Sequence, residues 1–303
     1  MVSLEEQSNL VRKLVFRLVK KHIAGPTSAS VLNVVRDLNK NGLHATVTLL
    51  NDHVDDQTKA RYNTNAYIQF VKQVSRLNLN SDISIRLSQI GYWVDKDLLE
   101  KNIRSIMEVS NSYDQMLWIE SEPNIETSEI APLYKELKKS YEKIGIELTP
   151  VSSKNNNPSL NGLISKKDIV KLKYQVIKKE ESEEKIDRMN LYKNYIDALM
   201  ERNVSLTILD NDSKLLEKII GAGKGYKRNL IFEIPLGYDN KRLGKLQKSK
   251  LNISVYVPYG KDWIPYFINR LAEGRVKRIA IALLNGEKTG AKENAKENRK
   301  TSK

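Results

Sequence analysis

The sequence predicts an α/β fold, a closed (β/α)8 TIM-type barrel with an extra N-terminal helix and a basic, disordered C-terminal tail. Eight short apolar runs recur along the chain, and amphipathic helical segments separate them. Eight such units within about 250 residues are typical of a closed barrel rather than an open sheet. In a barrel of this class, functional side chains are expected at the carboxyl ends of the strands.

The first half of the chain shows the pattern most regularly. Apolar spacing predicts a helix over 5–24, and GPTS then caps a second helix that ends at the Asn-Gly pair 41–42. Further helices are expected over 59–77, 96–109 and 130–144 because apolar residues recur there at helical spacing. The short apolar runs between them predict strands at 45–50, 82–87, 115–120 and 146–151.

The second half continues the alternation after a polar loop. Strands are expected at 169–176, 204–209, 229–234 and 252–257, and helices at 186–201, 213–220, 240–248 and 262–273. One more apolar segment follows at 278–284. The last residues hold no apolar side chain larger than Ala and repeat AKEN, which indicates a solvated tail. These patterns divide the chain into an N-terminal helix at 1–25, a barrel at 26–285 and a tail at 286–303.

Composition narrows the function classes. The 303 residues include no cysteine and only three histidines, so a disulfide framework, a thiolate metal site and a Cys nucleophile are excluded, and no metal centre is predicted. No apolar run approaches the 18–20 residues or so of a membrane span, and the start lacks a signal-peptide profile. We therefore expect a cytoplasmic protein.

The net charge of +14 is concentrated at one end. Residues 224–303 carry 19 basic and 7 acidic side chains, whereas the first 223 residues carry a net charge of only +2. This asymmetry is consistent with a solubilising surface, and it also predicts a polyanion partner such as RNA or the ribosome. The candidate contacts are Lys224, Lys227, Arg228, Lys241, Arg242, Lys245, Lys248, Arg275, Lys277 and Arg278.

The strongest local motif is VYVPYGKDWIPYFINRLAEG at 255–274. A strand containing Tyr256 is followed by a Pro-Tyr-Gly turn and a helix. That helix places Tyr266, Asn269, Arg270 and Glu273 on one face, at i, i+3, i+4 and i+7. Arginine at such a position suits bidentate binding of a carboxylate, although a surface salt bridge has the same spacing.

This motif resembles the last strand and helix of the proline dehydrogenase family, whose barrel uses FAD to oxidise L-proline to pyrroline-5-carboxylate. HIAGPTSASVLNVVRDLNKNGLHATVTLL, ISIRLSQIG and LWIESEP are similar to the family's first three strands and their surroundings. The resemblance implies a substrate pocket at Tyr256, Tyr266, Arg270 and Glu273. It also implies that Arg86 replaces the family's lysine and Glu120 its aspartate.

The flavin-facing positions depart from the family pattern. Thr149 stands where the family has Gln, Lys173 matches a family lysine only with a one-residue shift, and Asp210-Asn211 replaces Thr-His. Glu233 replaces another Gln, and Asn269 replaces the first Arg of the carboxylate clamp. Because reduced flavin is favoured by cations and hydrogen-bond donors, these changes predict weak or absent FAD binding. Thr149, Lys173 and Asn211 are the remaining candidates for flavin contact.

Two functions follow from these expectations. The preferred one is a non-catalytic barrel without a cofactor, a pseudoenzyme that binds RNA or the ribosome through its basic C-terminal face. The alternative is an FAD-dependent oxidoreductase acting on L-proline or a related imino acid. A membrane-surface role for the helix at 5–24 is the least favoured of the alternatives.

Overall fold

The structure of the protein is a computed structural model, which describes residues 20–51, 54–122, 124–150, 160, 162–173, 188–209, 230–237, 240–248 and 251–263. Two compact units are present, Lys21–Lys261 and a second made of Met1–Lys20 with Asp262–Lys303. Of the second unit, only Lys20, Asp262 and Trp263 are described. The helices expected over 5–24, 213–220 and 262–273, the segment at 278–284 and the tail lie wholly or mostly outside the described residues.

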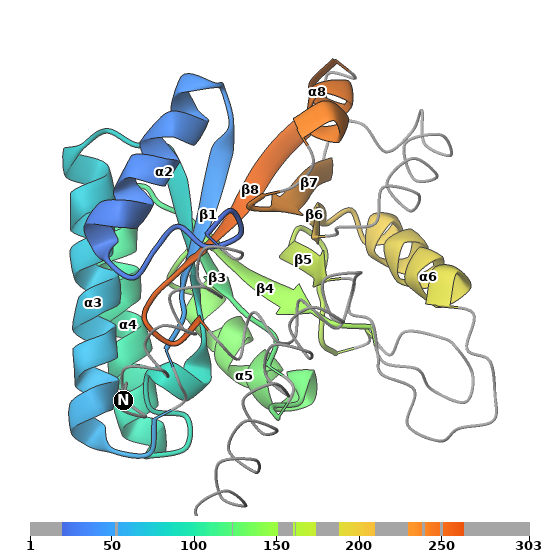
Figure 1. Cartoon of the computed structure of the whole chain (residues 1–303). Helices are drawn as coiled ribbons and strands as arrows, with labels where there is room; N and C mark the ends of the chain where they lie inside the picture. Colours follow the sequence, from blue (N-terminus) through green and yellow to red (C-terminus); the bar gives the residue numbers. More distant parts are fainter. Residues whose placement is uncertain are drawn as a thin grey trace, which may run out of the picture. The chain divides into compact units, whose positions relative to one another are not determined.

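The larger unit is a closed barrel of eight parallel strands (Figure 1), as the alternation of apolar runs predicted. Neighbours in sequence are neighbours in the sheet, and β8 pairs with β1 to close the barrel. The strands are β1 (His44–Leu49), β2 (Ser81–Ile85), β3 (Leu117–Ile119), β4 (Ile144–Leu148), β5 (Ile169–Lys173), β6 (Ser205–Leu209), β7 (Leu230–Pro235) and β8 (Asn252–Tyr259).

Helices alternate with strands along most of the chain, beginning with α2 before β1. Short polar side chains cap three of these helices: Thr27, Asp56 and Asp95 each accept a hydrogen bond from a backbone amide of the first turn of α2, α3 and α4. In Figure 1, α3 and α4 lie side by side along the barrel. The described helices are α2 (Ser28–Lys40), α3 (Gln57–Arg76), α4 (Lys96–Ser112), α5 (Thr127–Lys138), α6 (Arg188–Glu201) and α8 (Asn240–Lys248), with a 3-10 turn η1 at Leu87–Gln89. None of the helices within the described ranges is long and apolar enough to cross a membrane.

The prediction of a helix over 130–144 is wrong at its C-terminal end. Leu137, Tyr141 and Ile144 continue the helical spacing of apolar residues, yet α5 stops at Lys138 and Ile144 begins β4. The next residue, Gly145, pairs with Trp118 in the ladder, and a Cβ on it would lie 2.5 Å from the Trp118 ring. This close packing of strand against indole requires a glycine and fixes the register of β3 against β4.

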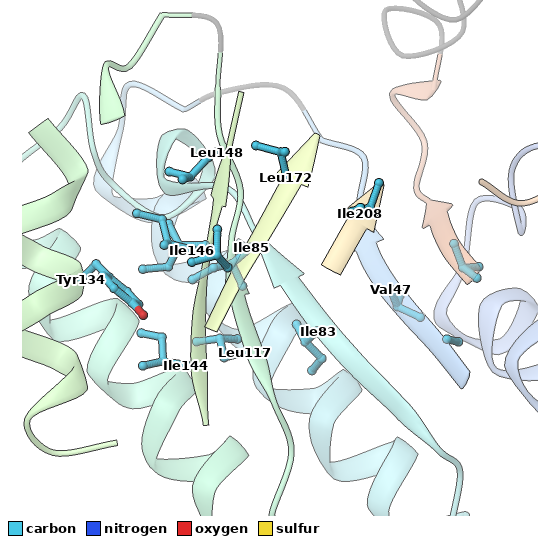
Figure 2. Packing of buried hydrophobic residues seen from close by; sticks show 14 of the residues in the cluster. Val47, Ile83, Ile85, Leu117, Tyr134, Ile144, Ile146, Leu148, Leu172 and Ile208 are labelled. Atoms are coloured by element: carbon cyan, nitrogen blue, oxygen red, sulfur yellow. The ribbon is translucent and has the colours of Figure 1, made fainter. Parts of the chain in front are cut away.

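The main hydrophobic core lies between the strands and the helices. Alternate residues of each strand, such as Val47, Ile83, Ile146 and Leu172, are buried in it. Figure 2 shows part of this cluster, in which Tyr134 of α5 lies beside Ile144. Because strand residues alternate between the two faces of the sheet, the other set must point into the barrel. That set is largely polar: it includes Thr46, Thr48, Ser84, Glu120, Glu147, Lys171, Thr207, Glu233 and Ser254, all buried.

Candidate active site

Arg86, Glu120 and Tyr256 meet at the carboxyl end of the barrel. Arg86 directly follows β2, Glu120 directly follows β3, and Tyr256 lies in β8. The Arg86 Nε donates to Glu120 Oε2 at 2.8 Å, and the Tyr256 hydroxyl donates to Glu120 Oε1, also at 2.8 Å. Both carboxylate oxygens of Glu120 are therefore held, by donors from two other parts of the barrel.

The electrostatics of this group keep Glu120 ionised. Burial raises the pKa of its carboxyl group, but the nearby charges of Arg86 and Lys173, with a hydrogen bond from Arg86, more than offset burial and lower the pKa to about 2. The Arg86 side chain is 26% exposed while that of Glu120 is 1% exposed, so the cation faces the mouth of the barrel. Among the described residues, the Arg86 guanidinium donates only through Nε, which leaves its terminal nitrogens for a ligand.

A second charged pair lies beside the first. Lys173, the last residue of β5, donates to Glu147 Oε1 of β4 at 3.1 Å. Ser121 also donates to Glu147 Oε1, at 3.0 Å, and its Oγ lies 2.7 Å from the Thr149 hydroxyl. The Lys173 side chain is 31% exposed, so this ammonium too is reached from the mouth.

A third pair lies in the barrel interior. Lys171 Nζ is 2.7 Å from Glu233 Oε2, and neither side chain is more than 1% exposed. The same ammonium lies over the Trp118 ring, 4.6 Å from its centroid, and 5.9 Å from that of Tyr256. These contacts join β3, β5, β7 and β8 across the interior.

The sequence-predicted substrate residues fall into two groups. The structure brings Arg86, Glu120 and Tyr256 into one hydrogen-bonded group. The others, Tyr266, Arg270 and Glu273, lie outside the described residues. Of the predicted flavin contacts, Lys173 and Thr149 lie near the mouth and Asn211 is outside the described residues.

Most of the predicted polyanion contacts also lie outside the described residues. Lys241, Arg242 and Lys245 belong to α8, but only their backbone is described, whereas the Lys248 side chain is exposed at the end of the same helix. The remaining positions lie outside the described residues: Lys224, Lys227, Arg228, Arg275, Lys277 and Arg278.

Sequence reasoning missed Glu147, Lys171 and Trp118. The signal was present in the strand segments IGIEL, IVKLK and IFEIP. In each of them, charged side chains occur in only one of the two alternating sets of strand positions. An alternating strand in a parallel barrel indicates that one of its faces is polar. Glu233 was noted, but its partner Lys171 was not.

The residues at the mouth fit a flavin. Reduced flavin carries negative charge that cations stabilise, and Lys173 places an ammonium at the end of β5, where Glu147 accepts a hydrogen bond from it. The Thr149 hydroxyl adds a donor or acceptor next to it. The carboxylate of Glu233, which replaces a Gln of the family pattern, is paired with Lys171. Its negative charge is therefore balanced within the described part of the barrel interior.

Comparison with known proteins finds similar proteins that are named proline dehydrogenases. No family model matches the chain. Proline dehydrogenase 2 of Bacillus subtilis is 28% identical over 86% of this chain and 88% of its own length. Proline dehydrogenase of Deinococcus radiodurans is 22% identical over 87% of this chain and 88% of its own length.

The fold has a counterpart among solved structures. Proline utilization A (PutA) of Bdellovibrio bacteriovorus, inactivated by N-propargylglycine, superposes with a TM-score of 0.71 at 13% identity. The match covers 87% of this chain but only 33% of PutA, so the chain spans about a third of that protein.

These relatives correct one prediction and support another. The expectation of no cofactor is wrong, because proline dehydrogenases are FAD-dependent and match the chain over most of its length. Its physical basis also fails, since Lys171 neutralises Glu233 and Lys173 supplies a cation at the mouth. The predicted resemblance to the proline dehydrogenase family is confirmed, since relatives of this name match the chain over most of its length and the fold has a counterpart in PutA.

Proposed function

We propose that this protein oxidises L-proline, or a related imino acid, to the corresponding cyclic imine, with FAD as the electron acceptor. The observation that carries the proposal is the hydrogen-bonded group of Arg86, Glu120 and Tyr256 at the carboxyl end of the barrel. The curated relatives favour this activity over the non-catalytic interpretation.

In this proposal Arg86 binds the substrate carboxylate. Glu120 holds the guanidinium through Nε, so the two terminal nitrogens present a fork that matches a carboxylate. Tyr256 holds the other oxygen of Glu120 from β8 and prevents that carboxylate from rotating. Arg270, Tyr266 and Glu273 would add to this pocket, as the resemblance implies.

Lys173 and Thr149 are the described residues that would hold the cofactor. When bound, FAD supplies the acceptor for the two electrons that leave the ring of the imino acid. Lys173 would oppose the negative charge that this transfer brings to the site, since its ammonium lies at the mouth and its pKa is kept above the ordinary value. Burial lowers that pKa, but Glu147 and Glu120 raise it by more.

Replacing Arg86 by methionine tests the proposal. We expect the kcat/KM of proline-dependent dye reduction by the FAD-loaded protein to fall by about a hundredfold or more, because a desolvated carboxylate–guanidinium contact is lost. R86K keeps the positive charge but not the two parallel donors of the guanidinium. Its kcat/KM should therefore lie between those of wild type and R86M.

Arg104 provides the matched control. It pairs with Glu100 and Glu136 on the outside of the barrel, so R104M should leave turnover unchanged. If wild-type protein shows no proline-dependent reduction, or if R86M keeps its kcat/KM, the proposal fails.

Polyanion binding by the basic C-terminal residues stays a prediction, supported by the net charge of +12 over residues 224–303. With about five phosphate contacts, affinity for single-stranded RNA should weaken about a hundredfold between 50 and 200 mM salt. Filter binding at both salt concentrations measures this, and a nearly constant affinity would contradict it.

A further inference from the structure

One carboxylate at the mouth is only half satisfied. The Glu147 side chain is fully buried, and its Oε1 accepts hydrogen bonds from Lys173 and Ser121. Its Oε2 is also buried but has no hydrogen-bond partner among the described residues. An anionic oxygen left without a donor in a buried position is costly, which indicates that a ligand supplies the donor.

A comparable buried carboxylate elsewhere in the barrel shows the contrast. Asp168, just before β5, pairs with Lys138 through Oδ1, as Glu147 pairs with Lys173. Its other oxygen, Oδ2, accepts from the Ser165 backbone amide at 2.8 Å. Asp168 is thus a complete structural ion pair at the amino end of a strand, whereas Glu147 is incomplete and lies at the carboxyl end.

Glu147 shares one electrostatic environment with the proposed substrate residues. The charges of Glu147, Glu120 and Arg86 all act on Lys173, and Lys173 in turn acts on Glu120. The mouth therefore combines an arginine with uncommitted terminal nitrogens and a carboxylate with an uncommitted oxygen, both within the described part of the barrel. An imino acid carries the complementary pair of charges, a carboxylate and a secondary ammonium.

We propose that Glu147 is the residue that recognises the ring nitrogen of the imino acid, with Oε2 accepting a hydrogen bond from the ammonium group. The inference rests on the proposed function and extends it, since it assigns the second charged group of the substrate to a residue on another strand. Arg86 and Glu147 then bind the two ends of the zwitterion, which selects zwitterionic amino acids over uncharged or purely anionic analogues.

The test compares two ligands that differ at the ring nitrogen. L-Proline has a ring N–H donor, whereas tetrahydrofuran-2-carboxylate has an ether oxygen there and cannot donate. Dissociation constants are measured on the FAD-loaded protein without oxygen, by stopped-flow reduction for proline and by perturbation of the flavin spectrum for the ether. For E147Q we expect proline affinity to fall by about 10- to 100-fold and ether affinity to stay the same or rise.

Two further variants separate recognition from structural damage. D168N removes a buried carboxylate paired with lysine away from the mouth, and it should change neither dissociation constant. The double variant E147Q/K173Q leaves no unpaired charge, so a purely structural defect would be repaired. We expect its selective loss of proline affinity to persist, because the carboxylate charge opposite the ring ammonium is still missing. If E147Q alone does not fold, the two dissociation constants are measured on the double variant instead.

Each other outcome overturns the inference. Equal weakening of both ligands, no change in either, or repair by the double variant would show that Glu147 only maintains the pocket. A loss of FAD affinity without selective loss of proline would show that Oε2 serves an N–H of the cofactor. If wild-type protein binds neither ligand and proline does not reduce its flavin, the proposed function and the inference fail together. That result is distinct from a failure of the inference alone.

Discussion

Replacing Lys171 by methionine is expected to lower the free energy of unfolding by about 3–5 kcal/mol, because Glu233 is left as a charge without a partner in the barrel interior. Both side chains are essentially inaccessible to water, so solvent cannot compensate for the lost cation. Denaturant unfolding with linear extrapolation measures the change.

The companion variants show whether the charge or the packing is responsible. K171M/E233Q removes both charges and should recover most of the stability. K193M breaks an exposed pair with Asp197 on α6 and should cost less than about 1 kcal/mol. A loss below 1 kcal/mol for K171M, or no recovery in the double variant, would contradict this account of the interior.

Replacing Glu120 by glutamine should give a stability loss that depends on pH. The pKa of Glu120 is lowered from 4.5 to about 2 in the folded protein. The ionised group therefore stabilises the fold above pH 4.5, and this contribution is lost as the pH falls through about 2. At 1.36 kcal/mol per pKa unit, the difference between wild type and E120Q should be about 3 kcal/mol at neutral pH. Unfolding curves recorded from pH 7 to pH 3 should show that the difference in free energy of unfolding between wild type and E120Q becomes smaller as the pH falls.

Glu122 gives a control of opposite sign. Burial raises the pKa of its carboxyl group, more than the hydrogen bonds from Ser88 lower it. Wild type should therefore gain stability relative to E122Q as the pH falls, because the folded state binds the proton more tightly. A difference between wild type and E120Q that stays constant with pH would show that Glu120 acts through packing alone.

The barrel was predictable because its signal is local. Each strand is a short apolar run between amphipathic helices, and such patterns are visible without knowing which strands pair. The end of α5 was missed because Ile144 satisfies both the helical spacing before it and the strand that follows. Only the packing of Gly145 against Trp118 decides between them.

The site was predictable only in part. Arg86, Glu120 and Tyr256 were found through a family resemblance, and the structure shows that they share hydrogen bonds. The pairing of Lys171 with Glu233 was not found, because β6 separates their strands and no sequence spacing encodes a contact across the interior. Glu233 without its partner was one of several replaced positions behind the wrong expectation of no cofactor.

The charged interior also bears on how the fold responds to heat. The hydration of ions becomes less favourable as temperature rises, so withdrawing Lys171 and Glu233 from water costs less in a warm solution than in a cool one. The apolar layer between strands and helices weakens instead on cooling. The two layers of this barrel therefore favour opposite ends of the temperature range, and the ionic interior contributes most where thermal unfolding begins.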